Sequence, residues 1–339
     1  MHDRDAHLDT VKTVAILCVI VIHVSSSGWS VFPTGSFEWV SNMFWASLTR
    51  AAVPLFMMCS GALLLNPKKE ITLKKLYTKN LPRVIAAMIV WAVFYKIYHL
   101  VDENQFTASA FIQAMKHVMV FDQEFHLYFV HMIILVYVLL PVTRVITRSA
   151  DKKQLEYSLA VWFIFGILYP TVRNFWPINL INGFPTQWII NMTYASIGYG
   201  LLGYYIKYCS TMRRRVYPVM LTTGFAIVFG GTWLISIIRG SFTDVFLGGM
   251  SVGVALMAAG LFGCLPGIRL RAISYISKAS FCIYLVHVVF LYLSEKVGFT
   301  IALFPAVLSV PLLSVAIFAC SCGVYAVLSQ IPVVNKWLI

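Results

Sequence analysis

The sequence predicts an all-α fold, a polytopic membrane helix bundle of about ten transmembrane helices with cytoplasmic N and C termini. The first observation is composition: 60% of the 339 residues are hydrophobic, 12% are charged, and the mean hydropathy is +0.81. Soluble domains have about 45–50% apolar and about 25% charged residues. A chain with half the usual fraction of charged residues cannot cover the water-exposed surface of a soluble globule of this size. Because no polar stretch is long enough for a separate soluble domain, we expect one integral membrane domain over residues 1–339.

The second observation is the number of apolar windows, because a transmembrane helix needs about 20 mostly apolar residues. Ten windows meet or approach this length: 11–31, 37–65, 82–101, 125–147, 155–172, 187–208, 216–238, 244–264, 279–297 and 299–329. The longest outer loop, about 102–124, is expected to contain a short amphipathic helix on the outer surface.

The third observation is where the positive charges lie. With a cytoplasmic N terminus, twenty of the 26 Lys and Arg residues fall in predicted cytoplasmic segments and five in outer segments, while Arg50 lies inside the second window. This alternation is a positive-inside signature and favours an even number of crossings. The net charge of +13 therefore indicates orientation and contact with anionic lipid, and nucleic acid is not expected as a partner.

The seven cysteines lie in or beside apolar windows and make no CxxC pair, so neither a metal site nor a disulfide framework is expected. The first apolar window lacks a small-x-small cleavage site. It is therefore predicted to be a retained first span and not a removed signal peptide.

An imidazole in the first window, His23, is the first candidate for function, because ionisable groups in membrane spans are costly. Lys12 precedes it by eleven residues, about three helical turns, and Asp9 lies within about 40° of the same face. His23 is expected near mid-depth. The alternative is a buried histidine bonded to a neighbouring backbone or side chain.

Arg50 is the second candidate, about a dozen residues into a span that enters from outside. An arginine does not lose its charge and needs an anionic partner, a ligand or water. Pro54 follows four residues later and should kink the helix. The alternative is a structural clamp to backbone carbonyls.

Two further windows carry polar groups. In "FHLYFVHMIILVYVLLPVTR", His126 is expected near the outer surface, and an interfacial anchor is the alternative to a functional role. In "SFCIYLVH", Ser280, Tyr284 and His287 form a polar stripe that must face protein or a cavity, and helix-to-helix hydrogen bonding is the alternative. These groups indicate one shared polar cavity in which an imidazole acts as general base, although a proton-coupled transporter would need the same groups.

The blocks "LDTVKTVAILCVIVIH", "RAAVPLFMMCSGALLL", "FHLYFVHMIILVYVLLP" and "SFCIYLVH" occur in this order between residues 8 and 287. In this the chain resembles the acyltransferase-3 family of bacterial integral membrane O-acyltransferases. Within that family it is most similar in type to the enterobacterial common antigen O-acetyltransferase.

The resemblance implies residue roles where the motifs match. The family signature Arg-x10-His reads Lys12-x10-His23 here, which makes His23 the catalytic base and Lys12 a donor-binding residue. The family's Arg-x-x-Arg is matched by Arg83 alone, because Asn80 stands at the first position with Lys79 beside it. A tryptophan usual in the fourth-window block is Tyr128 here.

The family also implies the reaction: an acyl group, here acetyl, moves from cytoplasmic acyl-CoA to a hydroxyl of a surface polysaccharide or lipid-linked sugar. The co-substrate is acetyl-CoA, no cofactor is bound permanently, and no metal is required. The pantetheine arm would run along the first span, and the location would be the bacterial inner membrane. As a hypothesis from its charge, Arg50 would stabilise the oxyanion or hold the carbonyl. Supporting or acceptor-side roles fall to Asp9, His126, Tyr284 and His287.

Two other classes remain open at this stage: a glycan-lipid transporter or flippase without acyl chemistry, and a membrane sensing or structural domain. Release of CoA thiol would distinguish an enzyme from both. Small-residue faces such as "GLLGYY" permit helix pairing in a homodimer.

Overall fold

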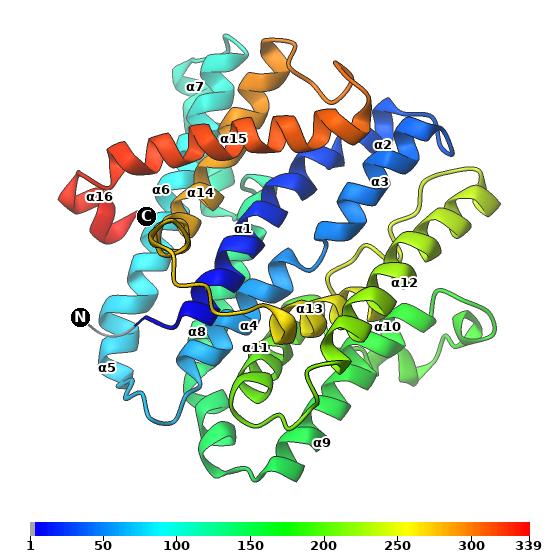
Figure 1. Ribbon diagram of the computed structural model, residues 1–339. Coiled ribbons are helices and arrows are strands. Elements are labelled where there is room, and N and C mark those ends of the chain that lie inside the picture. Colours follow the sequence, from blue (N-terminus) through cyan, green and yellow to red (C-terminus); the bar gives the residue numbers. More distant parts are fainter. Residues whose placement is uncertain (1–3) are drawn as a thin grey trace.

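The computed structural model describes residues 4–339, apart from the side chains of residues 192–195. In that part of the chain, helices joined by loops are the regular elements and there is no strand (Figure 1). Eight helical segments are long and apolar enough to cross a membrane, which confirms the polytopic helical class. They are Ala6–Val31, Phe37–Leu64, Leu73–Asp102, Phe125–Ser149, Lys152–Val172, Val216–Arg239, Arg271–Lys296 and Ala306–Leu328.

The two remaining predicted windows, 187–208 and 244–264, hold shorter helices. These are α11 (Met192–Tyr208) and α13 (Val252–Cys264), and α13 packs against α12 (Val216–Arg239), α11 and α4 (Ala52–Leu64). The other elements are α1 (Ala6–Ser26), α2 (Gly28–Val31), α3 (Phe37–Thr49), α5 (Leu73–Lys75), η1 (Leu76–Asn80), α6 (Leu81–Asp102), α7 (Ala108–Met119), η2 (Phe125–Leu127), α8 (Tyr128–Ser149), α9 (Lys152–Phe163), η3 (Ile164–Leu168), α10 (Tyr169–Val172), η4 (Ile178–Leu180), η5 (Phe184–Trp188), α14 (Arg271–Lys296), α15 (Ala306–Leu328) and α16 (Pro332–Trp337).

The second window is two helices, because Pro54 lies in the first turn of α4. Proline has no N–H and cannot bond the carbonyl four residues back, which belongs to Arg50. The α-helical hydrogen bonds accordingly stop at Thr49, although Arg50 and Ala51 keep right-handed helical dihedral angles, and regular bonding resumes with Leu55 N–H to Ala51 O at 2.9 Å. The predicted kink is confirmed, and it places Arg50 at the break between α3 and α4.

The first and last windows begin elsewhere than predicted. The Asp5 side chain caps the first helix by accepting from Leu8 N–H at 3.2 Å, so α1 starts at Ala6 and ends at Ser26. The last window was expected from residue 299, but residues 299–305 form a loop and α15 starts at Ala306, directly after Pro305. The short helix expected within 102–124 is confirmed as α7.

The core is built around α1, which packs against α14, α4, α3 and α15 (Figure 1). Asp9, buried with 5% exposure, fastens α1 to α14: it accepts from both Ser274 and Ser277, at 3.2 and 2.7 Å. It also accepts two bonds from Arg4, at 2.9 and 2.6 Å. Because this clamp joins the first turns of two parallel helices, it sets how their later turns face each other.

A second close contact joins α4 to α11. A Cβ on Gly61 would overlap the Gly200 carbonyl, so these two backbones touch where no side chain separates them. Small residues permit such an approach between membrane helices. The contact places α11 beside the part of α4 that leads from Arg50 to the opposite end of the bundle.

Candidate active site

His23 lies in the last turn of α1, because the helix starts early at Ala6 and ends before the turn at Ser27. Its expected position near mid-depth of the membrane stays a prediction. The side chain is half-buried, and its ring nitrogens make no hydrogen bond to any residue that the structure describes. The alternative, a buried histidine bonded to a neighbouring backbone or side chain, therefore does not apply to His23.

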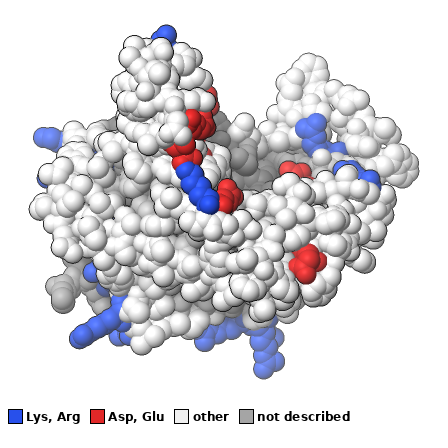
Figure 2. All heavy atoms as spheres, turned by 90° about the horizontal axis from the view of Figure 1, so that it is seen from above, with Lys and Arg blue, Asp and Glu red and all other residues white. Residues whose placement is uncertain are grey.

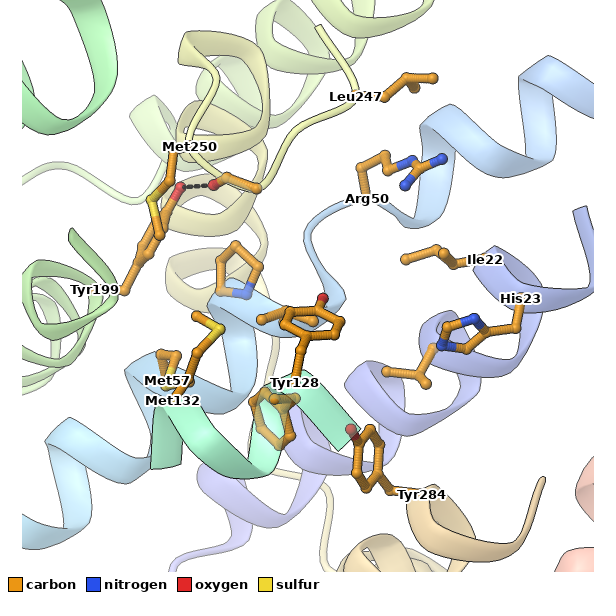
Figure 3. Close-up of a pocket in the computed structure, with 15 residues that line it drawn as sticks. Ile22, His23, Arg50, Met57, Tyr128, Met132, Tyr199, Leu247, Met250 and Tyr284 are labelled. Atoms are coloured by element: carbon orange, nitrogen blue, oxygen red, sulfur yellow. Dashed lines mark hydrogen bonds between the residues drawn. The ribbon is translucent and has the colours of Figure 1, made fainter. Parts of the chain in front are cut away.

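A cavity of about 140 Å³ lies beside His23 and brings together six parts of the chain (Figure 3). Its walls come from α1, the α3–α4 break, α8, α11, the loop before α13 and α14. Most of the lining is apolar, and the polar side chains are few: His23, Arg50, Tyr128, Tyr199 and Tyr284. A mostly apolar pocket with a few convergent polar groups is the usual form of a small-molecule site.

Arg50 enters this cavity from the helix break and has no anionic partner. Its Nε is buried without a hydrogen bond, and within the described residues no carboxylate forms an ion pair with it. The alternative of a clamp to backbone carbonyls is not what the structure contains. A charged group kept unpaired in a largely apolar cavity indicates that a ligand or a reaction intermediate supplies the opposite charge.

The three predicted histidines form one cluster. The ring centroid of His287 lies 5.0 Å from that of His23 and 5.6 Å from that of His126. His126 is fully buried, at 0% exposure, with neither ring nitrogen bonded, so the interpretation as an interfacial anchor is wrong. The reason is that its ring packs between those of Tyr95, Tyr284 and His287.

The tautomer of His287 follows from its contacts. Its Nδ1 lies 2.7 Å from the carbonyl oxygen of Tyr284, and a carbonyl only accepts, so Nδ1 carries the proton. The lone pair then resides on Nε2, which is buried and unpartnered. The stripe in α14 therefore presents a hydrogen-bond acceptor beside the His23 ring.

Three tyrosines shape the cavity. The Tyr284 hydroxyl donates to the carbonyl of His126, which holds η2 against α14. Tyr128 is 43% exposed and stands at the mouth of the cavity between His23 and Arg50 (Figure 3). Tyr199 donates to Gly249 O at 2.6 Å and fixes the loop before α13. Sequence reasoning missed Tyr199 as a lining residue, because nothing in its own helix marks it as polar and inward-facing.

The remaining predicted residues lie away from this cavity. Asp9 is occupied by the clamp between α1 and α14. Lys12 is half-buried on α1, Lys79 is exposed on η1, and Arg83 donates to the backbone oxygen of Ile339. The described residues contain no group of His, Cys, Asp or Glu side chains that could hold a metal ion.

The face seen from above in Figure 2 is hollowed, and both acidic and basic side chains lie at the edge of the hollow, with further basic side chains along the lower edge of the molecule in this view.

Membrane-spanning helices around a mostly apolar cavity, into which a few polar side chains converge, define a multi-pass membrane protein with an internal reaction or binding site. A family model described as "Acyltransferase domain", that of the acyltransferase-3 family, matches residues 5–326. The chain belongs to this family and is a membrane acyltransferase, which confirms the resemblance found in the sequence. No curated protein and no solved structure matches the chain.

Proposed function

We propose that the protein is an inner-membrane O-acetyltransferase that moves an acetyl group from cytoplasmic acetyl-CoA to a hydroxyl of a surface glycan or lipid-linked sugar. The observation that carries the proposal is the pairing of an unbonded imidazole, His23, with an unpaired guanidinium, Arg50, in one cavity. An imidazole has an ordinary pKa near 6.5 and exchanges protons readily at working pH.

The reaction needs a base that removes a proton and a positive group that stabilises an oxyanion, and the cavity contains one side chain for each role. His23 removes the hydroxyl proton as the acceptor oxygen attacks the thioester carbonyl. The carbonyl oxygen becomes an oxyanion, which the Arg50 guanidinium stabilises. The intermediate then collapses, the carbon–sulfur bond breaks, and the proton on His23 passes to the thiolate to give free CoA.

Arg50 suits an oxyanion because it forms no ion pair with a described carboxylate. The negative charge opposite its guanidinium would then arise only during the reaction. A group that acts mainly on the transition state raises kcat.

His287 and His126 support the base. The bonded Nδ1–H of His287 leaves Nε2 free to accept from a protonated His23, which would stabilise the imidazolium. The rings of His126 and Tyr284 pack against the His287 ring, and both residues are proposed to support the site on the acceptor side. Lys12, Lys79 and Arg83 are proposed donor-binding residues, and Asp9 supports the site by holding α1 against α14.

The test is CoA release by purified protein supplied with acetyl-CoA and surface-glycan acceptors. Wild-type protein should free thiol and acetylate the glycan, and His23→Ala should abolish both while remaining folded. Acetylation at the normal rate by folded His23→Ala protein would overturn the assignment of the base. Movement of glycan lipid without thiol release would favour a transporter or flippase.

A further inference from the structure

The His23 cavity has a polar end and an apolar end. His23 and Arg50 lie at the polar end. Figure 3 shows Met57 and Met132 at the other end, beyond Tyr128. The helices agree with this view, because Met57 follows Arg50 by seven residues, which is two turns or about 10 Å along the helix. The reacting carbonyl and the rest of an acyl group can therefore lie in different surroundings.

The apolar end suits an uncharged hydrocarbon group. Its lining consists of Val53, Met57, Phe129, Met132 and Met250 together with the ring of Tyr199. The Tyr199 hydroxyl already donates to Gly249 O at 2.6 Å, so no described side chain at this end has a free hydrogen to donate to a ligand. A carboxylate or hydroxyl placed there would lose its water without gaining a donor, which is costly.

The volume of the cavity limits the number of atoms that react in it. An apolar cavity of about 150 Å³ holds one benzene molecule, which has six heavy atoms. The His23 cavity, at about 140 Å³, has nearly the same capacity. A reacting acetyl group needs that number of atoms: the methyl carbon, the carbonyl carbon and oxygen, the thioester sulfur, and the attacking oxygen with its carbon. The extra carbons of a butyryl group would exceed the capacity.

Met57 and Met132 close the apolar end toward the interior of the bundle. Both are buried, at 2% and 4% exposure, and both belong to the main hydrophobic core. A second void, of about 10 Å³, lies one helical turn further along α4 and α8, where Gly61 and Val136 line it. Truncation of either methionine would therefore lengthen the cavity toward this void.

We propose that the apolar end holds the hydrocarbon part of the transferred acyl group, and that Met57 and Met132 limit this group to acetyl. The inference rests on the proposed function, because it assigns the same cavity to acyl transfer. It goes beyond that function by excluding two classes of donor. Longer acyl groups would collide with the methionines, and a succinyl group would place its carboxylate among apolar side chains.

The test is a competition between donors for one acceptor. The full-length purified protein receives equal amounts of acetyl-CoA and butyryl-CoA, or of acetyl-CoA and succinyl-CoA, together with the glycan and glycolipid extract of a strain that lacks the protein. Mass spectrometry of the acylated glycan gives the ratio of the products. Because one methylene in an apolar pocket changes the specificity about tenfold or more, the wild type should prefer acetyl over butyryl at least about 100-fold.

The truncations should relax this preference. Met57→Ala and Met132→Ala each remove the side-chain atoms beyond Cβ, which frees more space than the two additional methylenes of butyryl need. Each should raise the ratio of butyryl to acetyl product at least about tenfold. A gain of butyrylated product cannot arise from loss of folded protein, because unfolded molecules lower both products alike.

Met58→Ala is the matched control. Met58 lies beside Met57 on α4 and is also fully buried, at 0% exposure. The described lining of the cavity includes Met57 but not Met58, whose backbone packs against Gly203 of α11. The control loses the same atoms from the core and should keep the product ratio of the wild type.

The outcomes separate this inference from the proposed function. If the wild type transfers butyryl as readily as acetyl, or if neither truncation raises the product ratio above that of Met58→Ala, the methionines do not set the chain length and only this inference fails. Transfer of succinyl at the acetyl rate would also overturn it, because the site would then accept a carboxylate. If the wild type transfers no acyl group from any of the three donors, the proposed function itself fails.

Discussion

Replacing Arg50 should change activity and stability in opposite directions. Its Nε is buried without a bond, and no described carboxylate pairs with it. Leaving a buried donor unsatisfied costs about 1–3 kcal/mol, and the half-buried guanidinium places Arg50 toward the lower end of that range. Arg50→Met fills similar space without charge. We expect its free energy of unfolding to rise by about 1 kcal/mol.

Activity should fall in the same variant, because removal of one oxyanion-stabilising donor lowers kcat by about 10²–10³-fold. Arg50→Lys keeps the charge but lacks the planar fork, so it should recover only part of that loss. The assay is a thermal unfolding scan of the detergent-purified protein beside a thiol-release measurement at saturating acetyl-CoA and acceptor.

Arg144→Met is the matched control, since Arg144 is also buried but donates to three backbone oxygens. Its loss leaves those carbonyls unpaired, and we expect destabilisation of about 3 kcal/mol. The reasoning is refuted if Arg50→Met lowers the unfolding temperature as much as Arg144→Met does, or if it acylates at the wild-type rate.

Three further predictions concern the site, the packing and the ends of the chain. His287→Asn keeps a hydrogen-bond donor toward Tyr284 O but removes the Nε2 acceptor. We expect kcat to drop at least about tenfold and its pH profile to shift, while the unfolding temperature stays the same. An unchanged pH profile would exclude a supporting role for His287. Gly61→Ala should destabilise by about 2 kcal/mol or more because its Cβ meets the Gly200 carbonyl, whereas Gly200→Ala should be nearly neutral in the same thermal scan; equal effects would contradict the packing. Burial raises the pKa of the Asp5 carboxyl, but bonds to Lys207 and to the Leu8 N–H lower it further, to below its usual 3.8. The pair therefore stabilises the fold above about pH 4 and loses this contribution as the pH falls through the folded-state pKa, so Lys207→Met should remove about 1 kcal/mol of acid sensitivity from unfolding scans between pH 3 and 7.

Much of the fold was predictable because its signals are local. Every predicted window contains a helix, since an apolar run in a membrane must satisfy its own backbone. The break at Arg50 was predictable from Pro54, which acts on the carbonyl four residues before it. The start of α1 was missed because a single capping carboxylate, Asp5, extends the helix beyond the apolar run.

The site was predictable only as a list of candidates. His23, Arg50, His126, Tyr284 and His287 do gather, whereas Asp9 and Arg83, equally plausible on spacing, bond to partners elsewhere. The periodicity of one helix shows which residues share a face but not which helix that face meets.

The sequence by itself determined the membrane class, the helical windows, the break at Pro54 and the candidate imidazole and guanidinium, because each depends on residues within a few turns of one another. Only the tertiary structure decided which polar side chains share a cavity and which of the candidates bond to partners elsewhere. These depend on contacts between residues tens to hundreds of positions apart, such as Asp9 with Ser277 or Lys69 with Arg144, and no local pattern specifies such pairs.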